Sequence, residues 1–322
     1  MTNAARHLFD SRPHRFSDPN YKPWLNPSRF ASFEWCPRIY NWKYVKLLDA
    51  PSSGFTEPMI QGSLYHTMAE AYDKGIDAWM ALERKAAEMR TDGCYEVKWS
   101  VVIDYLQDEI YKKWFPLYKE FWDPLTERYE IISLEKAYHA EFPSFHLITK
   151  PDKVVRDLET GLVWVVERKT TKRDDSQWAN KWRMNMQTTA EVIAVEKNLD
   201  EIVAGVYLEP VVVTRRKSKT WSWNTPQPIA NFTHYPWRPV PKPDFIRREW
   251  ERWAEDKVAE LKWRYQTGRE WEGHLLHCGD CRMNKYCSGL VKADDNKLGL
   301  VPISDDYVTE AQASHSKAGG KP

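Results

Sequence analysis

The sequence is poor in cysteine and glycine and carries almost no net charge, and each shortage narrows the possible functions. Its 322 residues contain 5 Cys and 13 Gly, and 47 Lys and Arg nearly balance 46 Asp and Glu. The sequence has no Gly-rich phosphate-binding loop, which argues against a nucleoside triphosphatase. The balanced charge excludes a histone-like polycation, although local basic patches remain able to bind nucleic acid.

Long apolar runs and internal repeats are also missing from the sequence. No run reaches the ~18 apolar residues of a membrane-spanning helix, and the mean hydropathy is −0.69. The first residues contain no apolar segment of the kind found in secretory signals, so we expect a cytoplasmic protein without a membrane partner. Hydrophobic residues still make up 42% of the chain, which is enough for a sizeable core in one or two domains.

Aromatic residues, in contrast, are abundant. The chain contains 17 Trp, 16 Tyr and 11 Phe, and many of them stand beside Lys or Arg. The simplest interpretation is core filling, with the cationic side chains lying along the rings. The alternative is that some rings stack on nucleic-acid bases while the neighbouring cations bind phosphates. Composition leaves both interpretations open.

The cysteines are clustered in a way that indicates a metal site. Disulfides are not expected in a cytosolic chain, and three cysteines have the spacing C-x2-C-x5-C: Cys278, Cys281 and Cys287. A tetrahedral site needs a fourth ligand, and Cys36 is the best candidate. Cys94 lies in an amphipathic segment, where we expect it to pack as a small apolar residue. The spacing does not separate zinc from an iron–sulfur cluster, and His274 and His277 keep a mixed Cys/His zinc site open.

The character of the sequence changes along the chain and predicts an α/β protein. The N-terminal third has helical periodicity, and β-branched runs follow from about residue 129. The predicted segments are a flexible arm (1–25), a helical region with Cys36 and His66 (26–128), a β-rich core (129–242), a helix with the cysteine triplet (243–290) and a disordered tail (291–322).

Hydrophobic periodicity also predicts individual elements. The expected helices cover residues 28–44 (with Ser28 as the N-cap), 62–90, 96–118, 176–198 and 244–267. Strands are expected at 130–142 and 201–213, and residues 218–223 are proposed as the hairpin partner of the second strand. Two β-branched runs around the turn Glu159–Gly161 predict a further hairpin.

This further hairpin places charged residues in a pattern that indicates catalysis. With its turn centred near Thr160, facing residue numbers sum to ~320, so Asp152 lies opposite Arg168. Glu167 and Lys169 are two apart on a strand and therefore share one face. Two carboxylates and a lysine are costly to bury unpaired, and a Mg²⁺ or Mn²⁺ ion would resolve the conflict. The alternative, a solvated surface hairpin, is disfavoured by the apolar run LVWVV before Glu167.

These residues resemble the PD-(D/E)xK signature of the restriction-endonuclease-like superfamily, because Pro151, Asp152, Glu167 and Lys169 read PD-x14-ERK. Three further features are similar to RecB-type nuclease domains: the segment SRFASFEWCPRIYNWKY (Ser28–Tyr44), the segment GSLYH (Gly62–His66) and Gln187 in the helix after the lysine strand. The cysteine framework resembles the iron–sulfur branch of that family. This branch includes AddB-type helicase–nuclease subunits, the CRISPR adaptation nuclease Cas-four and phage-encoded relatives. The resemblance covers about residues 26–290.

The resemblance implies a restriction-endonuclease-like core, with a mixed central sheet flanked by helices, and a role for each matched residue. His66, Asp152 and Glu167 would bind a catalytic Mg²⁺ or Mn²⁺ ion, helped by the backbone carbonyl of Arg168. Lys169 would orient the attacking water or stabilise the charge that develops on the phosphate. A 4Fe–4S cluster, tying the first helix to the C-terminal segment, would be held by Cys36, Cys278, Cys281 and Cys287.

The chain departs from the family pattern in two places. Gln187 would contact the scissile phosphate or orient Lys169, but the family often has Gln-x3-Tyr, and this chain has Glu191 at the tyrosine position. Residues 95–128 and 220–243 exceed the length of the adaptation nucleases, and we interpret them as insertions that serve another partner.

Basic residues after the predicted catalytic strand indicate a path for nucleic acid. They stand near tryptophans, as expected of a surface that binds phosphates and stacks bases, although a solvated turn at 215–219 is the alternative. The candidate contacts are Lys172, Arg173, Lys181, Arg183, Arg215, Arg216, Lys217 and Trp221.

The sequence therefore predicts a metal-dependent DNA nuclease, with exonuclease action on single-stranded or resected DNA favoured over endonuclease action. Recombination, repair or CRISPR-type DNA processing is the expected setting, with a helicase, an integrase or a recombination protein as the partner. Two alternatives stay open. One is a non-catalytic nucleic-acid-binding module with a vestigial acidic site, and the other is a zinc-stapled adaptor.

Overall fold

The structure is a computed structural model, and part of the chain is described in it. The disordered tail that the sequence predicts lies outside this part except for residues 301–302. Of the predicted flexible arm, residues 16, 18 and 20–25 are described, and Phe16 is buried in the core. The described residues are 16, 18, 20–45, 48–49, 57–91, 100–172, 175–215, 229–234, 236–269, 281 and 301–302.

A mixed six-stranded sheet forms the centre of the molecule. Its strands follow the order β10-β8-β7-β6-β3, and β9 pairs with β8 beyond the end of β10. β7 and β8 are parallel, while the other neighbours are antiparallel. The strands are β3 (Tyr129–Leu134), β6 (Lys153–Asp157), β7 (Val163–Thr171), β8 (Val203–Arg215), β9 (Ile229–His234) and β10 (Arg238–Pro241).

Two smaller sheets accompany the central one. The first has the order β1-β5-β4, and the second pairs β11 with β2. Their strands are β1 (Trp24–Leu25), β2 (Leu48–Asp49), β4 (Tyr138–Glu141), β5 (His146–Thr149) and β11 (Val301–Pro302). β5 leads directly to the start of β6, so the small three-stranded sheet borders the hairpin that carries Asp152.

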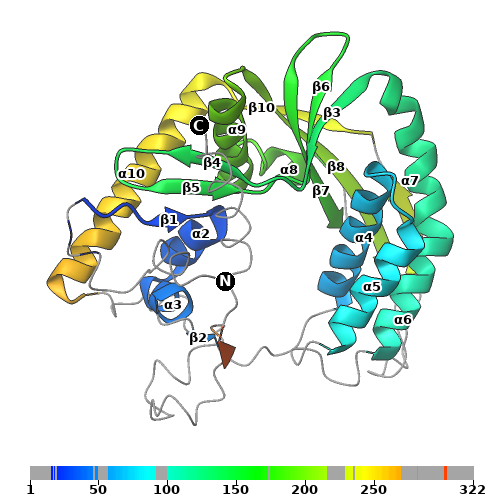
Figure 1. Ribbon diagram of the computed structural model, residues 1–322, viewed down its shortest axis with the longest axis horizontal. Coiled ribbons are helices and arrows are strands. Elements are labelled where there is room, and N and C mark those ends of the chain that lie inside the picture. Colours follow the sequence, from blue (N-terminus) through cyan, green and yellow to red (C-terminus); the bar gives the residue numbers. More distant parts are fainter. Residues whose placement is uncertain are drawn as a thin grey trace, which may run out of the picture.

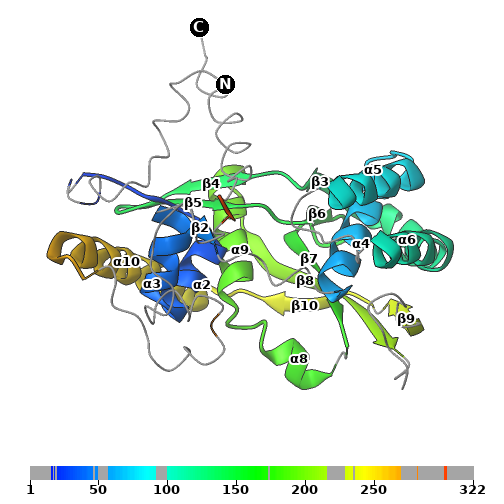
Figure 2. The same cartoon turned by 90° about the horizontal axis from the view of Figure 1, so that it is seen from below.

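Helices cover both faces of the central sheet, one group on each side (Figures 1 and 2). Successive side chains of β7 point to opposite faces. Val163 and Val165 belong to a core shared with α2, α9 and α10, and Trp164 and Val166 belong to a core shared with the helices α4 to α7. This arrangement confirms the predicted α/β class and the mixed sheet flanked by helices.

The first helical group begins at the N-terminal end of the described chain. Asn26, rather than the predicted Ser28, caps its first helix, because the Asn26 side chain accepts a hydrogen bond from Arg29 N at 2.8 Å. The predicted single helix over 28–44 is interrupted at Cys36, where the backbone is extended. The group comprises α2 (Pro27–Trp35), α3 (Pro37–Tyr40), the π-helix η2 (Asn41–Val45), α8 (Ser176–Asn180), α9 (Met186–Leu199) and α10 (Asp244–Thr267).

The second helical group packs on the other face. The predicted helix over 62–90 is two helices, because Gly75 adopts a left-handed conformation with φ of 67° and the chain turns there. The group comprises α4 (Glu57–Asp73), α5 (Ala78–Thr91), α6 (Ser100–Glu109), the π-helix η4 (Ile110–Trp114), α7 (Phe115–Trp122) and the 3₁₀ helix η5 (Asp123–Glu127). None of the helices in the described part of the chain is long and apolar enough to cross a membrane.

The hairpin and the last helix match the sequence predictions, whereas other elements differ. The helix expected at 176–198 is instead two helices, α8 and α9, which a turn at 181–185 separates. α10 has the predicted bounds, and the β6–β7 register pairs Lys153 with Val166 and Val154 with Val165. The single strand expected at 130–142 is instead β3 and β4, which belong to different sheets and turn apart at Glu135, where φ is 46°. β8 pairs with β9 at 229–234, and the proposed partner 218–223 lies outside the described residues.

Candidate active site

The β6–β7 hairpin brings Asp152 to the two charged residues of β7. Asp152 stands immediately before β6, and its Oδ2 atom accepts a hydrogen bond from Arg168 N at 2.7 Å. Glu167 and Lys169 extend from the same face of β7 and form an ion pair with each other. The predicted neighbourhood of Asp152, Glu167 and Lys169 is therefore present.

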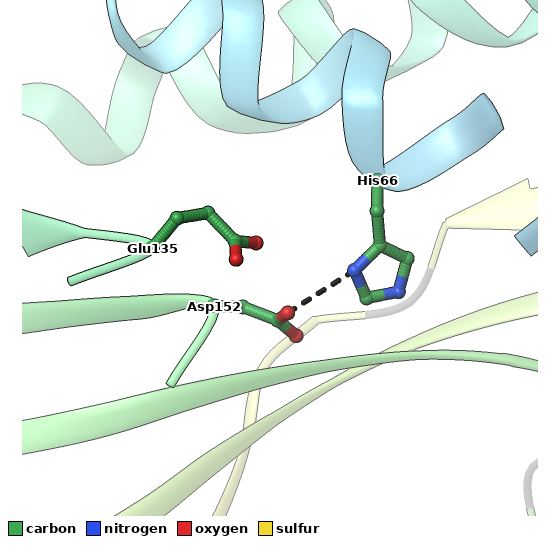
Figure 3. A group of neighbouring side chains, drawn as sticks. All are labelled: His66, Glu135 and Asp152. Carbon is green, nitrogen blue, oxygen red and sulfur yellow. Dashed lines mark hydrogen bonds and ion pairs between the residues drawn. The ribbon is translucent and has the colours of Figure 1, made fainter. Parts of the chain in front are cut away.

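His66 reaches this site from the opposite helical group. It lies on α4, and its Nδ1 atom is 3.1 Å from Asp152 Oδ1, as Figure 3 shows. A Cβ atom added to Gly62, one turn earlier on α4, would lie 3.4 Å from Thr170 Oγ1. α4 therefore passes close to the end of β7, which accounts for the contact between residues 86 positions apart in the sequence.

Glu135 is a site residue that the sequence analysis missed. It lies between β3 and β4 and points toward Asp152 and His66 (Figure 3). Its backbone N donates to Asp152 O at 3.1 Å, and its Oε2 atom is 3.2 Å from Lys150 Nζ. The segment 130–142 alternates well enough to be interpreted as one strand, so the sequence carries no clear signal of the turn that directs Glu135 inward.

Three side chains offer ligand atoms for a divalent cation. One atom each of His66, Glu135 and Asp152 lies within 4.8 Å of the others. Carboxylate oxygens are the ligands that suit Mg²⁺ and Mn²⁺, so the two carboxylates fit such an ion, and the imidazole nitrogen adds a softer donor that favours Mn²⁺ over Mg²⁺. Glu167, the other predicted carboxylate ligand, contacts Lys169 and Gln187, and its part in binding metal stays a prediction.

The carboxylates of the site affect one another electrostatically. Burial alone would raise the pKa of Asp152, but attraction to His66 and the hydrogen bond between them lower it to about 2. The pKa of His66 is raised, because the pull of Asp152 exceeds the opposing effect of burial. Burial and repulsion by Asp152 raise the pKa of Glu135 and also raise that of Glu167, to about 7. Such mutual repulsion is expected where carboxylates gather to hold a cation.

Gln187 contacts Glu167 rather than Lys169. It follows Asn185, the N-cap of α9, whose side chain accepts from Thr188 N at 3.0 Å. The Gln187 amide Nε2 donates to Glu167 Oε1 at 3.0 Å and to Glu191 Oε1 at 2.9 Å. Glu191, at the position of the family tyrosine, is buried, and burial followed by repulsion from Glu167 raises its pKa well above the ordinary value.

Arg168 lies between the two β7 site residues, but its side chain is on the opposite face of the sheet. There it contacts Asp73, Tyr118 and Glu209. A role of its backbone carbonyl in binding metal stays a prediction.

Two of the four predicted cluster cysteines can be described. Cys36 is buried at the junction of α2 and α3, and Cys281 is partly buried; Cys278 and Cys287 lie outside the described residues. The C-terminal end of α10 packs near Cys36, because Tyr265 Oη donates to Asn41 Oδ1 at 3.0 Å. The chain that continues toward the cysteine triplet therefore starts beside the helices that flank Cys36.

The predicted nucleic-acid contacts are described only in part. Lys172, Lys181 and Arg183 are exposed, and for Arg215 only the backbone is described. Arg173, Arg216, Lys217 and Trp221 lie outside the described residues.

Beside the site is a hollow of about 440 Å³, lined by residues that include Ser28, Lys181, Met184 and Gln187. Trp182 lies near both Lys169 and Lys181, whose Nζ atoms are 5.5 and 5.6 Å from its ring centre. The hollow therefore adjoins the Glu167 side of the site through Gln187 and has a lysine in its wall.

Comparison with known proteins adds a family match to this geometry. The family model described as the PD-(D/E)XK nuclease superfamily matches residues 25–288. No curated protein matches the chain. A crystal structure of a provisionally named exonuclease from Eubacterium rectale is similar at 12% sequence identity and a TM-score of 0.44, covering 96% of this chain and 98% of that one.

Proposed function

The chain belongs to the PD-(D/E)XK nuclease superfamily, and on that basis we propose that it is a metal-dependent deoxyribonuclease that acts as an exonuclease on single-stranded or resected DNA. The observation that carries the proposal is the convergence of His66, Glu135 and Asp152 beside the Glu167–Lys169 pair. These residues come from separate elements, and a solvated surface hairpin gives no reason for them to meet.

Each residue has a proposed part in hydrolysis. His66, Glu135 and Asp152 would hold the Mg²⁺ or Mn²⁺ ion. The bound ion supplies positive charge that polarises the phosphodiester. Lys169, held against Glu167, orients the attacking water and stabilises the negative charge that develops on the phosphate. Gln187 fixes the Glu167 carboxylate through its amide hydrogen bond.

The hollow beside Gln187 supports a path for a single strand. Its wall contains Lys181, and both Lys181 and Lys169 lie near the ring of Trp182, so cations continue from the site into the hollow. Lysine side chains bind backbone phosphates without regard to base sequence. We infer that the strand leaves the metal site over Gln187 and passes Lys181.

We also propose that Cys36 joins Cys278, Cys281 and Cys287 in a 4Fe–4S cluster. The position of α10 beside α3 supports it, because the chain enters the triplet close to Cys36. The cluster would be structural, holding the first helix to the C-terminal segment. Iron and sulfide analysis of anaerobically purified protein tests this, and stoichiometric zinc would refute it.

The proposed setting is cytoplasmic DNA recombination, repair or CRISPR-type DNA processing, with a helicase or an integrase as partner. This setting follows from the sequence resemblance. It is tested separately from the catalytic proposal, by copurification of the tagged protein with such a partner.

Cleavage of end-labelled linear and of circular single-stranded DNA, with Mg²⁺ or Mn²⁺, tests the catalytic proposal. The wild type should cut the linear strand and spare the circle, and Lys169→Ala should lower the rate at least ~100-fold, as expected for loss of a transition-state contact. Lys85→Ala, on the distant helix α5, is the matched control and should cut like the wild type.

Three results would contradict the proposal in different ways. Cutting of the circle would show endonuclease action. Equal cutting by Lys169→Ala would show a contaminant. DNA binding without cleavage by either protein would favour the non-catalytic binding module.

A further inference from the structure

Three elements that carry candidate site residues also carry an adjacent residue that points into a buried polar cluster. Tyr65 precedes His66 on α4, Lys153 follows Asp152, and Arg168 separates Glu167 from Lys169. We call this the buried charge cluster, and its members are Tyr65, Asp73, Tyr118, Lys153, Arg168, Glu209 and His234. Because neighbours on a strand point to opposite faces, the cluster lies behind the site, under the helices α4 to α7.

Arg168 is the centre of the buried charge cluster. Its Nη2 atom contacts Asp73 on α4 and lies 2.9 Å from Tyr118 Oη, and its Nε atom lies 3.2 Å from Glu209 Oε1 on β8. The side chains of Arg168, Asp73 and Glu209 are all 0% exposed. One guanidinium group therefore joins α4, α7, β7 and β8.

The other members of the buried charge cluster contact the two carboxylates that Arg168 binds. Lys153 Nζ lies 2.8 Å from Asp73 Oδ2 and 3.5 Å from the ring centre of Trp122. Tyr65 Oη lies 2.8 Å from His234 Nε2, which in turn lies 3.3 Å from Glu209 Oε1. Two carboxylates, Asp73 and Glu209, thus balance two buried cations, and β6 is joined to α4 as well.

Such a cluster is poorly explained by stability alone. Burying charged groups costs so much desolvation energy that apolar residues of similar volume often stabilise a fold equally well. Arg168 Nη1 adds to the cost, since this buried atom has no hydrogen-bond partner among the described residues. The benefit must then lie in fixed geometry, which charged hydrogen bonds provide better than apolar contacts do.

We propose that the buried charge cluster positions the metal ligands, with Arg168 and Asp73 as the main positioning residues; this rests on the proposed nuclease function. Asp73 stands two turns after His66 on α4, so its contacts with Arg168 and Lys153 fix the helix over β6 and β7. The backbone N of Arg168 holds Asp152 at 2.7 Å. Movement of Arg168 would therefore displace Asp152, Glu167 and Lys169 together.

The test uses variants that change the cluster without touching the site. Asp73→Asn keeps the shape of the side chain but removes the charge that faces Arg168 and Lys153. Glu209→Gln does the same from β8, a strand that carries no proposed ligand. Each variant should raise the Mn²⁺ dissociation constant and lower kcat by about 10- to 100-fold, as for partners behind metal ligands. The KM for DNA should stay within about twofold, because the exposed lysines are unchanged.

Asp157→Asn is the matched control. Asp157 is a buried carboxylate at the other end of β6, 2% exposed, and lies 2.9 Å from Arg128. This variant should lose comparable stability but bind Mn²⁺ like the wild type. An equal loss of Mn²⁺ affinity in Asp157→Asn, or wild-type affinity and kcat in folded Asp73→Asn and Glu209→Gln, would overturn the proposal.

A crystal structure of Asp73→Asn or Glu209→Gln gives a readout that is independent of activity. The separation of His66 Nδ1 and Asp152 Oδ1, 3.1 Å in the wild type, should increase by more than the coordinate error. An unchanged separation in both variants would refute positioning, whatever their activity. Failure of the wild type to bind Mn²⁺ would instead refute the nuclease proposal, and the crystal separation would still decide the structural claim.

Discussion

At the scale of single residues, Glu135 is a proposed metal ligand at a position with no motif around it. Its carboxylate repels that of Asp152, and a cation between them would convert this repulsion into binding energy. We expect Glu135→Gln to weaken Mn²⁺ binding at least about tenfold, or 1.4 kcal/mol, while high Mn²⁺ concentrations restore most of the activity. Calorimetric titration with Mn²⁺ measures the change.

The control for this variant is Glu130→Gln. Glu130 lies on β3, five residues before Glu135, and its side chain is 59% exposed. It should bind Mn²⁺ and cleave DNA like the wild type. If Glu135→Gln also behaved like the wild type, Glu135 would not be a ligand.

Lys242 offers a pH-dependent prediction away from the site. Its Nζ atom donates to the carbonyls of Trp182 and Arg183 at 2.7 and 2.8 Å, and burial lowers the pKa of Lys242 to about 8. The unfolded chain holds its lysine proton up to about pH 10.4, so it binds more protons than the folded protein between these values. The contribution of Lys242 to stability therefore rises with pH from 8 to about 10.4.

Urea unfolding of the wild type and Lys242→Met at several pH values tests this. The stability of the wild type relative to the variant should increase through the window by up to about 3 kcal/mol. Lys136→Met, at an exposed position, should follow the wild type at every pH. A difference between wild type and Lys242→Met that stays constant with pH would contradict the prediction.

At the scale of secondary-structure elements, Gly205 controls how β10 joins the sheet. It pairs with Pro241 and has φ of 154°, and an added Cβ atom would lie 2.4 Å from Val240 O and 2.8 Å from Pro241 Cα. Gly205→Ala must therefore push β10 away from β8 and should destabilise the protein by more than about 1 kcal/mol, measured by urea unfolding.

Gly161→Ala is the control that measures the effect of backbone strain without a steric clash. Gly161 also has a left-handed backbone, with φ of 71°, but an added Cβ atom would meet nothing within 4 Å. The loss of stability should thus be smaller in Gly161→Ala than in Gly205→Ala. If both variants lost the same stability, the clash of the added Cβ atom with β10 would make no contribution to the loss in Gly205→Ala.

Individual elements and residues show which parts of the fold and of the site could be predicted from the sequence alone. The β6–β7 hairpin was predictable because its turn and alternation are local, and α10 because its periodicity and flanking residues are local. Glu135 was missed because a left-handed residue between two strands leaves no periodic signal. Asp73 and Glu209 were missed because a lone acidic residue is usually solvated, and its burial depends on Arg168 and Lys153 from distant elements.

At the scale of the whole molecule, the proposed metal site joins α4, the β3–β4 connection and the start of β6. An ion that binds only the folded protein stabilises it by ~2.7 kcal/mol at 100 times its dissociation constant. We expect saturating Mn²⁺ to raise Tm by roughly 5 °C in a protein of this size, as measured by circular dichroism, and a chelator should reverse the shift.

Asp152→Asn should abolish that shift and, without metal, should be less stable than the wild type at neutral pH, because the lowered pKa of Asp152 means that its attraction to His66 outweighs burial and the repulsion from Glu135 and Glu167. Asp157→Asn, at the far end of β6, should keep the full shift. A shift of equal size in Asp152→Asn would place the stabilising ion elsewhere in the molecule.

The run Glu167-Arg168-Lys169 sends alternate side chains through opposite faces of one strand, and this has an evolutionary consequence. Inserting or deleting a single residue within β7 would exchange odd and even positions, turning Glu167 and Lys169 toward the buried charge cluster and Arg168 toward the site. The turn at 158–162 should therefore tolerate changes of length among relatives, whereas the strand itself should change only by substitution. The assignment of each β7 residue to an odd or an even position, and not only the residue types in the strand, should therefore be the same among relatives.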